Sequence, residues 1–215
     1  MSEEVSLRIV GVTPGDEIAG ARRIEIRTTR GDIPIIMHAA ASPGRAVLCV
    51  SGALGGYDGP ATLYARLGLE LPRKEVSVVR LNYRAPNEFG ECVVDTMAGL
   101  AFLKGTGYER IALIGHSFGG AVAINASTLS PSVTTVIAIS SQLAGAHVID
   151  EVAPRPLLLI HGTADTILPH ESSERLYERA REPKTLKLFA GAEHRMTEVG
   201  DELFALVSDW LLTKL

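Results

Sequence analysis

The sequence predicts an α/β protein: a mostly parallel, twisted sheet with helices on both faces and an antiparallel N-terminal edge. Between residues 46 and 191 it contains short, almost wholly apolar runs, as strands buried on both faces of a parallel sheet require. Helix-like segments separate these runs, and alternating strand and helix implies βαβ units with right-handed crossovers. The first forty residues differ, because they include a stretch that alternates polar and apolar positions, which is typical of antiparallel strands.

The predicted strands begin with a hairpin. The segment ARRIEIRTTRGDIPIIMHAA alternates around Arg30-Gly31-Asp32, which places an antiparallel hairpin at one edge of the sheet. The buried strands are expected to follow at 46–51, 76–82, 110–117, 133–140, 156–162 and 185–191.

Helices are predicted between these strands. Two segments repeat apolar residues three or four positions apart, and each repeat predicts one buried face. In 88–104 this face holds Val93, Met97, Leu100 and Ala101, and in 198–214 it holds Leu203, Val207, Trp210 and Leu211. Weaker helical patterns cover 58–70 and 171–182. Asp95, in the first of these helices, is expected to be solvated.

Composition narrows the class of protein. The chain has 215 residues, of which 46% are hydrophobic, so one globular domain spanning 1–215 is expected. The net charge of −4, without a basic block, argues against nucleic acid as the main partner. No apolar run approaches the length of a membrane span, and MSEEVSLRIV lacks the features of a signal peptide.

The two cysteines, Cys49 and Cys92, both lie in apolar patterns. They are expected to be buried free thiols, which fits a cytoplasmic protein better than a secreted one. No Cys/His cluster has metal-ligand spacing, so neither a metal nor another cofactor is predicted. The sequence does not indicate an oligomeric state.

In such a sheet, functional residues gather at the carboxyl ends of the strands. Four loops follow predicted strands in this way: SGALGGYDG, GHSFGG, HGTADTILPH and AGAEHRMTE. They contain a glycine turn, a serine, an aspartate and a histidine. The candidate site is therefore expected where these loops meet.

The serine loop, LIGHSFGG, places Ser117 between a buried-strand pattern and a helix pattern. A residue in a sharp strand-to-helix turn has a strained backbone, and its neighbours must be small because strand and helix approach closely. Gly115, Gly119 and Gly120 meet that requirement. The turn lifts the hydroxyl above the sheet and directs the Phe118 amide toward the same spot. The alternative is a serine that only caps the helix.

A serine needs a base to take its proton and a third group to orient that base. HGTAD and AGAEH place Asp165 and His194 just past two later strands. The order Ser117, Asp165, His194, with the motifs GHSFGG, HGTAD and AEH, resembles the α/β-hydrolase superfamily over about residues 30–215. The small lidless members, similar to dienelactone hydrolases and carboxylesterases, are the nearest in character. The resemblance implies that Ser117 is the nucleophile, His194 the general base and acid, and Asp165 the residue that orients His194.

Other residues could fill these roles. His116 precedes the serine, but its side chain should diverge from that of Ser117, so a local hydrogen bond is favoured over a role as the base. Glu193 could replace Asp165 as the orienting carboxylate, although adjacent side chains rarely meet productively. His161 is expected to anchor the HGTAD turn, and His170 to be a solvated residue near a helix start.

The glycine loop SGALGGYDG fits neither the dinucleotide-binding pattern G-x-G-x-x-G nor a P-loop, so a nucleotide site fails on spacing. Acyl transfer instead needs two amides for the developing oxyanion, and the second must come from this loop. Gly52 is expected to turn the backbone toward the nucleophile. The second donor, beside Phe118, is expected to be Ala53 or else Leu54. Many relatives have His-Gly where this chain has Ser-Gly, so the exact geometry of this loop stays open. The alternative is an ordinary glycine-rich turn that binds no anion.

The substrate cleft is expected to be open, because the interval 142–155 is too short for the cap that lidded relatives insert there. Its predicted lining is mostly apolar: Leu54, Tyr57, Leu143, Ile167 and Met196. Such a cleft suits a small or medium acyl ester or thioester. Arg84 and Arg195 leave contact with a substrate carboxylate open, although Arg84 could equally pair with an acid or lie on the surface.

Three functions fit these observations. The first is a serine carboxylester hydrolase, and the second is a related acyl-transfer enzyme such as a thioesterase, acylaminoacyl-type peptidase or perhydrolase. The third is a non-catalytic binding module with the same fold, but such proteins usually lose a member of the triad.

Overall fold

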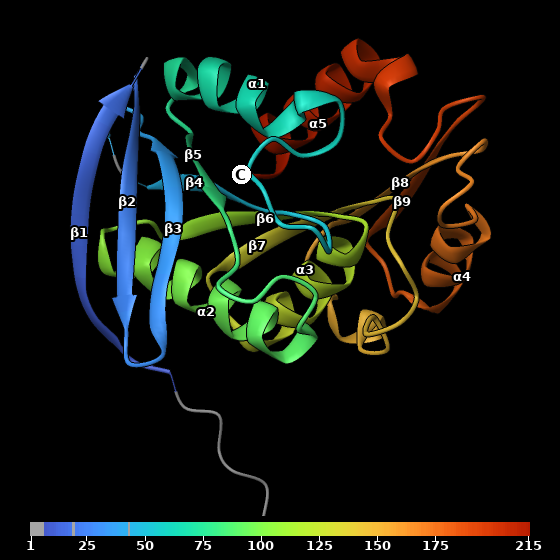
Figure 1. The fold of residues 1–215 in the computed structure, drawn as a ribbon. Coiled ribbons are helices and arrows are strands. Elements are labelled where there is room, and N and C mark those ends of the chain that lie inside the picture. Colours follow the sequence, from blue (N-terminus) through green and yellow to red (C-terminus); the bar gives the residue numbers. More distant parts are fainter. Residues whose placement is uncertain (1–6, 19, 43) are drawn as a thin grey trace, which may run out of the picture.

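The computed structural model describes residues 7–18, 20–42 and 44–215. Its centre is a nine-stranded sheet in the order β1-β2-β3-β5-β4-β6-β7-β8-β9 (Figure 1). The strands β4 to β9 pair in parallel, whereas β1, β2 and β3 form an antiparallel edge that joins the rest through β5. The bounds are β1 Ile9–Ile18, β2 Ala21–Thr28, β3 Gly31–His38, β4 Arg45–Val50, β5 Ser77–Leu81, β6 Arg110–His116, β7 Val133–Ile139, β8 Leu157–Gly162 and β9 Lys184–Phe189.

Helices cover both faces of this sheet (Figure 1). On one face lie α1 (Leu63–Glu70) and α5 (Gly200–Lys214), and on the other lie α2 (Phe89–Gly105), α3 (Phe118–Leu129) and α4 (Glu171–Arg179). Short 3-10 helices span Pro60–Thr62, Leu71–Lys74, Ile149–Glu151 and Thr197–Val199. Strand β4 shows why its sequence is continuously apolar: Leu48 packs in the core on one face, and Val47 and Cys49 in the core on the other.

Most of these elements agree with the sequence-based predictions. The hairpin is confirmed as β2 and β3, with Thr28 opposite Gly31, and the six predicted strands are confirmed as β4 to β9. The expected burial is wrong for β9, which lies at the edge of the sheet and buries only Phe189. The strand β1 was not predicted. Its Pro14 and two glycines break the alternating pattern, and its register with β2 shifts twice. Part of the N-terminal segment weighed as a signal peptide, residues 1–6, lies outside the described residues.

The buried face of α2 is confirmed at three of its four predicted residues: Leu100 is buried, and Val93 and Met97 pack against the core. Ala101 is exposed, and the helix also buries two polar residues, Asp95 and Thr96, both with 0% relative exposure. The expectation that Asp95 is solvated was wrong. Hydrophobic periodicity missed these two polar residues, because it assigns polar residues to solvent even where the interior holds a partner for them.

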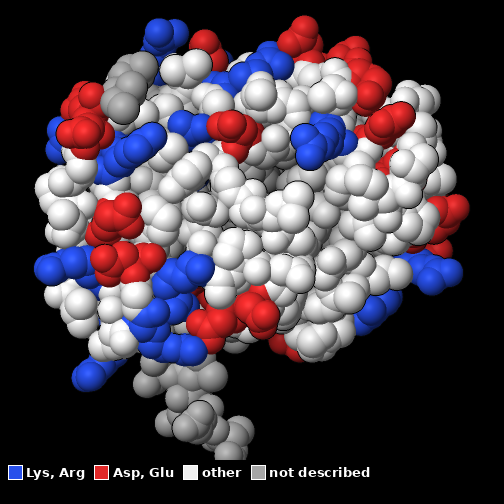
Figure 2. All heavy atoms as spheres, viewed as in Figure 1, with Lys and Arg blue, Asp and Glu red and all other residues white. Residues whose placement is uncertain are grey.

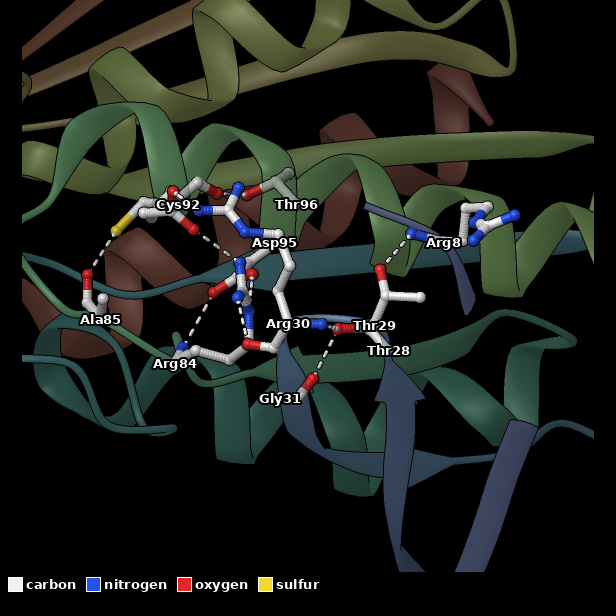
Figure 3. A network of polar contacts seen from close by, with 11 residues as sticks. Arg8, Thr28, Thr29, Arg30, Gly31, Arg84, Ala85, Cys92, Asp95 and Thr96 are labelled. Carbon is white, nitrogen blue, oxygen red and sulfur yellow. Dashed lines mark hydrogen bonds and ion pairs between the residues drawn. The ribbon is translucent and has the colours of Figure 1, made fainter. Parts of the chain in front are cut away.

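That partner is Arg84, which follows β5 (Figure 3). Its Nε and backbone amide donate to the two oxygens of Asp95 at 2.5 and 2.8 Å, and its Nη2 lies 2.9 Å from Glu91. Glu91 also meets Arg30, from the β2–β3 turn, at 2.6 Å. Of the roles left open for Arg84, pairing with an acid is the one confirmed. Burial raises the pKa of Asp95, and the hydrogen bonds from Arg84 oppose that rise without cancelling it.

The remaining expectations concern the cysteines, membrane-spanning helices and metal-binding groups. Cys49 and Cys92 are buried free thiols, and burial raises the pKa of both. Within residues 7–18, 20–42 and 44–215, none of the helices combines the length and apolar character that crossing a bilayer takes. In the same part of the chain, no group of three His, Cys, Asp or Glu side chains is placed to hold a metal ion.

Candidate active site

The turn at Ser117 has the strained geometry that the motif predicted. Ser117 joins β6 to α3 with φ 59° and ψ −122°, a combination that side-chain-bearing residues rarely adopt. Its amide donates to the Ile139 carbonyl at 2.8 Å, which ties the turn to the neighbouring strand β7. The glycines are required by space: a Cβ at Gly115 would overlap the Gly119 carbonyl, and one at Gly119 would overlap the Ser51 carbonyl.

Asp165 and His194 meet at the same edge of the sheet. The His194 Nδ1 lies 2.7 Å from Asp165 Oδ2, and the Asp165 side chain is fully buried. The other oxygen, Oδ1, accepts the amides of Ile167 at 2.9 Å and Leu168 at 2.8 Å. Burial alone would raise the pKa of Asp165. These hydrogen bonds outweigh it, so the pKa lies below its ordinary value and the carboxylate is ionised at neutral pH.

The contact between Ser117 and His194 stays a prediction. Because Nδ1 of His194 faces Asp165, Nε2 is the ring nitrogen left to take a proton. In the described part of the chain, no hydrogen bond within 3.5 Å joins the Ser117 hydroxyl to His194. Such contacts are often loose in empty sites and tighten when substrate binds.

His116 supports the loop of His194. Its Nε2 lies 2.9 Å from the His194 carbonyl, and the two rings are 4.8 Å apart. Burial lowers the pKa of His116 to about 4, so the ring is neutral and Nε2 donates. This confirms the expected local hydrogen bond. Glu193 is exposed, and Asp165 is the carboxylate that contacts His194.

The glycine loop forms a turn close to Ser117. The Gly55 amide donates to the Gly52 carbonyl at 3.0 Å, which puts Ala53 and Leu54 at the corners of the turn. Among the described residues, neither the Ala53 nor the Leu54 amide donates to a backbone acceptor. The Phe118 amide opens α3 and so has no partner within the helix. These are the amides predicted for the oxyanion, and their role stays a prediction.

Two neighbours of β5 hold this loop in place. The Asn82 side-chain oxygen accepts the Gly56 amide at 2.9 Å, and the Tyr83 hydroxyl donates to the Ser51 carbonyl at 3.2 Å. The expectation for Gly52 needs a correction. Its φ lies outside the left-handed region, and a Cβ there would sit 3.7 Å from the Ser117 Cβ. A Cβ at Gly52 would therefore make only ordinary contacts, and the glycine that this turn requires is Gly55, with φ 74°.

Of the residues predicted to line the cleft, the structure exposes some and buries others. Leu54 is 92% and Ile167 66% exposed, on the loops that carry the glycine turn and Asp165. Tyr57 is partly buried, and Leu143 packs against the core. Met196 was a wrong choice: it is 0% exposed and belongs to the core beneath α1 and α5, so it faces away from any open cleft.

The surroundings of Ser117 are open. The interval 142–155 holds the short helix Ile149–Glu151, and no cap is inserted. Two cavities of about 410 and 650 Å³ lie away from this site, and neither is lined by Ser117, Asp165 or His194. The larger one lies between the start of β1 and α2. Figure 2 shows uncharged atoms across the middle of one face, with basic and acidic side chains interspersed around it.

The likenesses to known proteins agree with this fold. A family model described as serine aminopeptidase, S33, matches residues 147–199. The chain is 30% identical to the uncharacterised protein YfhR of Escherichia coli K12 over 157 residues, 58% of this chain and 55% of YfhR. It is 28% identical to Rv2307c of Mycobacterium tuberculosis over 195 residues, 76% of this chain and 68% of that protein. The chain thus spans about half the length of YfhR.

Solved structures resemble nearly the whole chain. A dienelactone hydrolase from Anabaena variabilis matches with a TM-score of 0.78 and 16% identity, covering 94% of this chain and 99% of its own. Est1E from Butyrivibrio proteoclasticus matches with a TM-score of 0.78 and 14% identity, covering 91% and 99%. The sheet order, the strained turn at Ser117 and these likenesses define an α/β-hydrolase fold.

Proposed function

We propose that this protein is a serine hydrolase that cleaves a small or medium carboxylic ester through an acyl-enzyme intermediate. One observation carries the proposal: the strained turn that presents Ser117 lies at the same edge of the sheet as the 2.7 Å contact between His194 and Asp165. Separate loops carry the proposed nucleophile, base and orienting carboxylate to this edge, which supports the proposal.

The first half of the reaction forms the acyl-enzyme. The Ser117 oxygen attacks the ester carbonyl while its proton passes to Nε2 of His194. The negative charge that develops on the carbonyl oxygen is met by the amides of Phe118 and Ala53, with Leu54 as the alternative second donor. When the tetrahedral intermediate collapses, His194 gives the proton to the departing alcohol oxygen and the acyl group stays on Ser117.

The second half of the reaction regenerates the free enzyme. Water enters, His194 takes one of its protons, and the resulting hydroxide equivalent adds to the acyl carbon. Collapse breaks the bond to the Ser117 oxygen, which recovers its proton from His194, and the carboxylic acid leaves. The same steps act on thioesters and amides. A peptidase of the acylaminoacyl type is the second candidate, because the family model that matches residues 147–199 describes serine aminopeptidases.

The substrate class follows from the open site. Leu54 and Ile167 expose apolar surface on the two loops beside the triad, which suits an uncharged acyl group. Arg84 is committed to Asp95 and Glu91, so it does not select a carboxylate, whereas Arg195 is exposed. The proposed partner is thus a small-molecule acyl substrate.

The proposal predicts that Ser117→Ala removes nearly all ester hydrolysis. Because triad members act as a unit, kcat should fall by about 10⁴–10⁶ while circular dichroism stays that of the wild type. A fluorophosphonate probe should label the wild-type protein at Ser117 and leave Ser117→Ala unlabelled. A panel of aryl esters, acyl-CoAs and acyl-peptides then ranks the ester, thioester and peptide activities.

Two results would contradict it. Hydrolysis at the wild-type rate by Ser117→Ala would show that another residue is the nucleophile. A folded wild-type protein that neither hydrolyses any member of the panel nor reacts with the probe would favour the non-catalytic binding module. Ser172→Ala is the matched control, because Ser172 is a buried serine that lies outside the triad.

A further inference from the structure

The orienting aspartate has a second imidazole beside it. His161, at the end of β8, is fully buried, and its Nε2 lies 3.1 Å from Asp165 Oδ2, the same oxygen that meets His194. The same nitrogen is 3.1 Å from the Leu168 carbonyl. A carboxylate at neutral pH and a carbonyl are both acceptors only, so Nε2 of His161 must carry a hydrogen and donate to them.

The other ring nitrogen is held from α4. The Nδ1 of His161 lies 2.7 Å from the Ser173 hydroxyl, which is also fully buried. Burial lowers the pKa of His161, although Leu168 and Asp165 oppose the change, so the ring is neutral. In a neutral ring whose Nε2 bears the hydrogen, Nδ1 is an acceptor, and Ser173 therefore donates to it. One tautomer satisfies all of these contacts.

The contacts saturate the Asp165 carboxylate. Two backbone amides fix Oδ1, and two imidazole N–H groups converge on Oδ2. The ionisable groups whose charges act on His161 are Asp165 and His194, and α4 contributes the uncharged Ser173 hydroxyl. His161 thus shares the oxygen on which the orientation of His194 depends.

We propose that His161, fixed by Ser173, is a positioning residue that holds Oδ2 of Asp165 in place and limits how strongly this oxygen attracts the proton on His194. The inference rests on the proposed function, in which His194 is the base. His161 does not touch the substrate. It acts through Asp165, and a residue that merely tied β8 to α4 would change stability without changing the pH profile of the reaction.

A pair of substitutions separates these roles. His161→Leu keeps much of the volume and removes the donor, whereas His161→Gln keeps an N–H donor near the position of Nε2. With an aryl ester, His161→Leu should lower kcat about tenfold or more, as the loss of a hydrogen bond to a charged group implies, with KM changed less than about twofold. His161→Gln should recover most of the loss.

The pH dependence of kcat/KM tests the direction in which His161 acts on the reaction. Without its second N–H donor, Oδ2 attracts the proton of the imidazole beside it more strongly. The acid limb of kcat/KM should therefore move to higher pH in His161→Leu, and by less in Ser173→Ala. Ser172→Ala is the matched control, since Ser172 neighbours Ser173 on α4 and is also buried, and its profile should stay that of the wild type.

A measurement on the wild-type protein does not depend on activity. Nitrogen-15 NMR of the histidine rings should show His161 as the neutral Nε2–H tautomer at pH 7. An Nδ1–H tautomer, or wild-type kcat and pH profile in both His161→Leu and Ser173→Ala, would overturn the inference. If His161→Leu fails to fold, the pH profile of Ser173→Ala and the His161 tautomer in the wild-type protein test the inference. A wild-type protein that is inactive and unlabelled by the fluorophosphonate probe refutes the proposed function instead, and the tautomer result stands apart from it.

Discussion

Asp165 is the residue whose chemistry the structure constrains most closely. Its Oδ1 accepts two backbone amides, so in Asp165→Asn the amide oxygen must take that position and the NH₂ group must face His161 and His194. Both imidazoles donate toward that point, and hydrogen would meet hydrogen. His194 must then change tautomer or turn away. We expect a loss of about 10⁴-fold in kcat at pH 7, measured with an aryl ester.

The matched control for this prediction is Glu193→Gln. It removes an exposed carboxylate next to His194 in the sequence and should leave kcat unchanged. The reverse result, a severe loss in Glu193→Gln and none in Asp165→Asn, would show that Glu193 orients the base.

At this scale, sequence motifs predicted the contact between Asp165 and His194 better than the residues that support it. Both residues were selected by motif, loop position and chain order. The burial of Met196 has no such signal, since a methionine two residues after His194 can point toward either side of its loop. The contact between His161 and Ser173 joins two elements and has no local signature, although the motif HGTAD predicted that His161 anchors the turn.

The loop between β4 and α1 shows which glycine a turn needs. Gly55 has φ 74°, and a Cβ there would lie 2.7 Å from the Asn82 oxygen that accepts the Gly56 amide. Gly55→Ala therefore strains the turn and displaces its anchor. A Cβ at Gly52 would instead meet its nearest atoms at 3.6–3.9 Å, which is ordinary contact.

We therefore expect Gly55→Ala to lower kcat on an aryl ester about tenfold or more with a smaller change in KM, because the displaced amide meets charge present only in the transition state. Gly52→Ala should keep the wild-type melting temperature. Equal kcat in Gly55→Ala and the wild type would mean that this turn does not supply an oxyanion donor.

Elements buried on both faces were the easiest to predict. Strands such as β4 and β8 read as unbroken apolar runs because each face meets a separate layer of helices. The edge strand β1 has no such constraint, and its exposed valines, proline and glycines carry little pattern. The burial of Asp95 in α2 was missed for the opposite reason, because a residue of a buried ion pair has no sequence signal that separates it from an exposed polar residue.

The stability of the whole molecule should depend on histidines that fold in the neutral form. The His38 ring packs so closely against Gly68 of α1 that a Cβ on this glycine would lie 2.6 Å from the ring. The Nε2 of His38 has no hydrogen-bond partner among the described residues. Burial, and to a smaller extent the charge of Arg80, lowers its pKa from 6.5 to about 4. His116, at the active site, has a pKa lowered to about 4, mainly by burial.

The sign of the pH dependence follows from these values. Between pH 6.5 and about 4 the unfolded chain binds protons at both positions and the folded protein does not, so the contribution to stability is complete above pH 6.5 and is lost as the pH falls. We expect the free energy of unfolding in urea to drop between pH 7 and pH 5. For His38 alone, the linkage amounts to about 1–2 kcal/mol over that interval.

His38→Leu isolates this contribution. Leucine fills much of the same space without a titrating group or an unpartnered nitrogen, so the variant should resemble the wild type at pH 7 and exceed it by about 1–2 kcal/mol at pH 5. The control is His147→Gln on the exposed segment before the helix Ile149–Glu151, which should keep the wild-type pH dependence. If His38→Leu loses stability with falling pH as steeply as the wild type, then His38 is not neutral in the folded protein and the acid sensitivity comes from other groups.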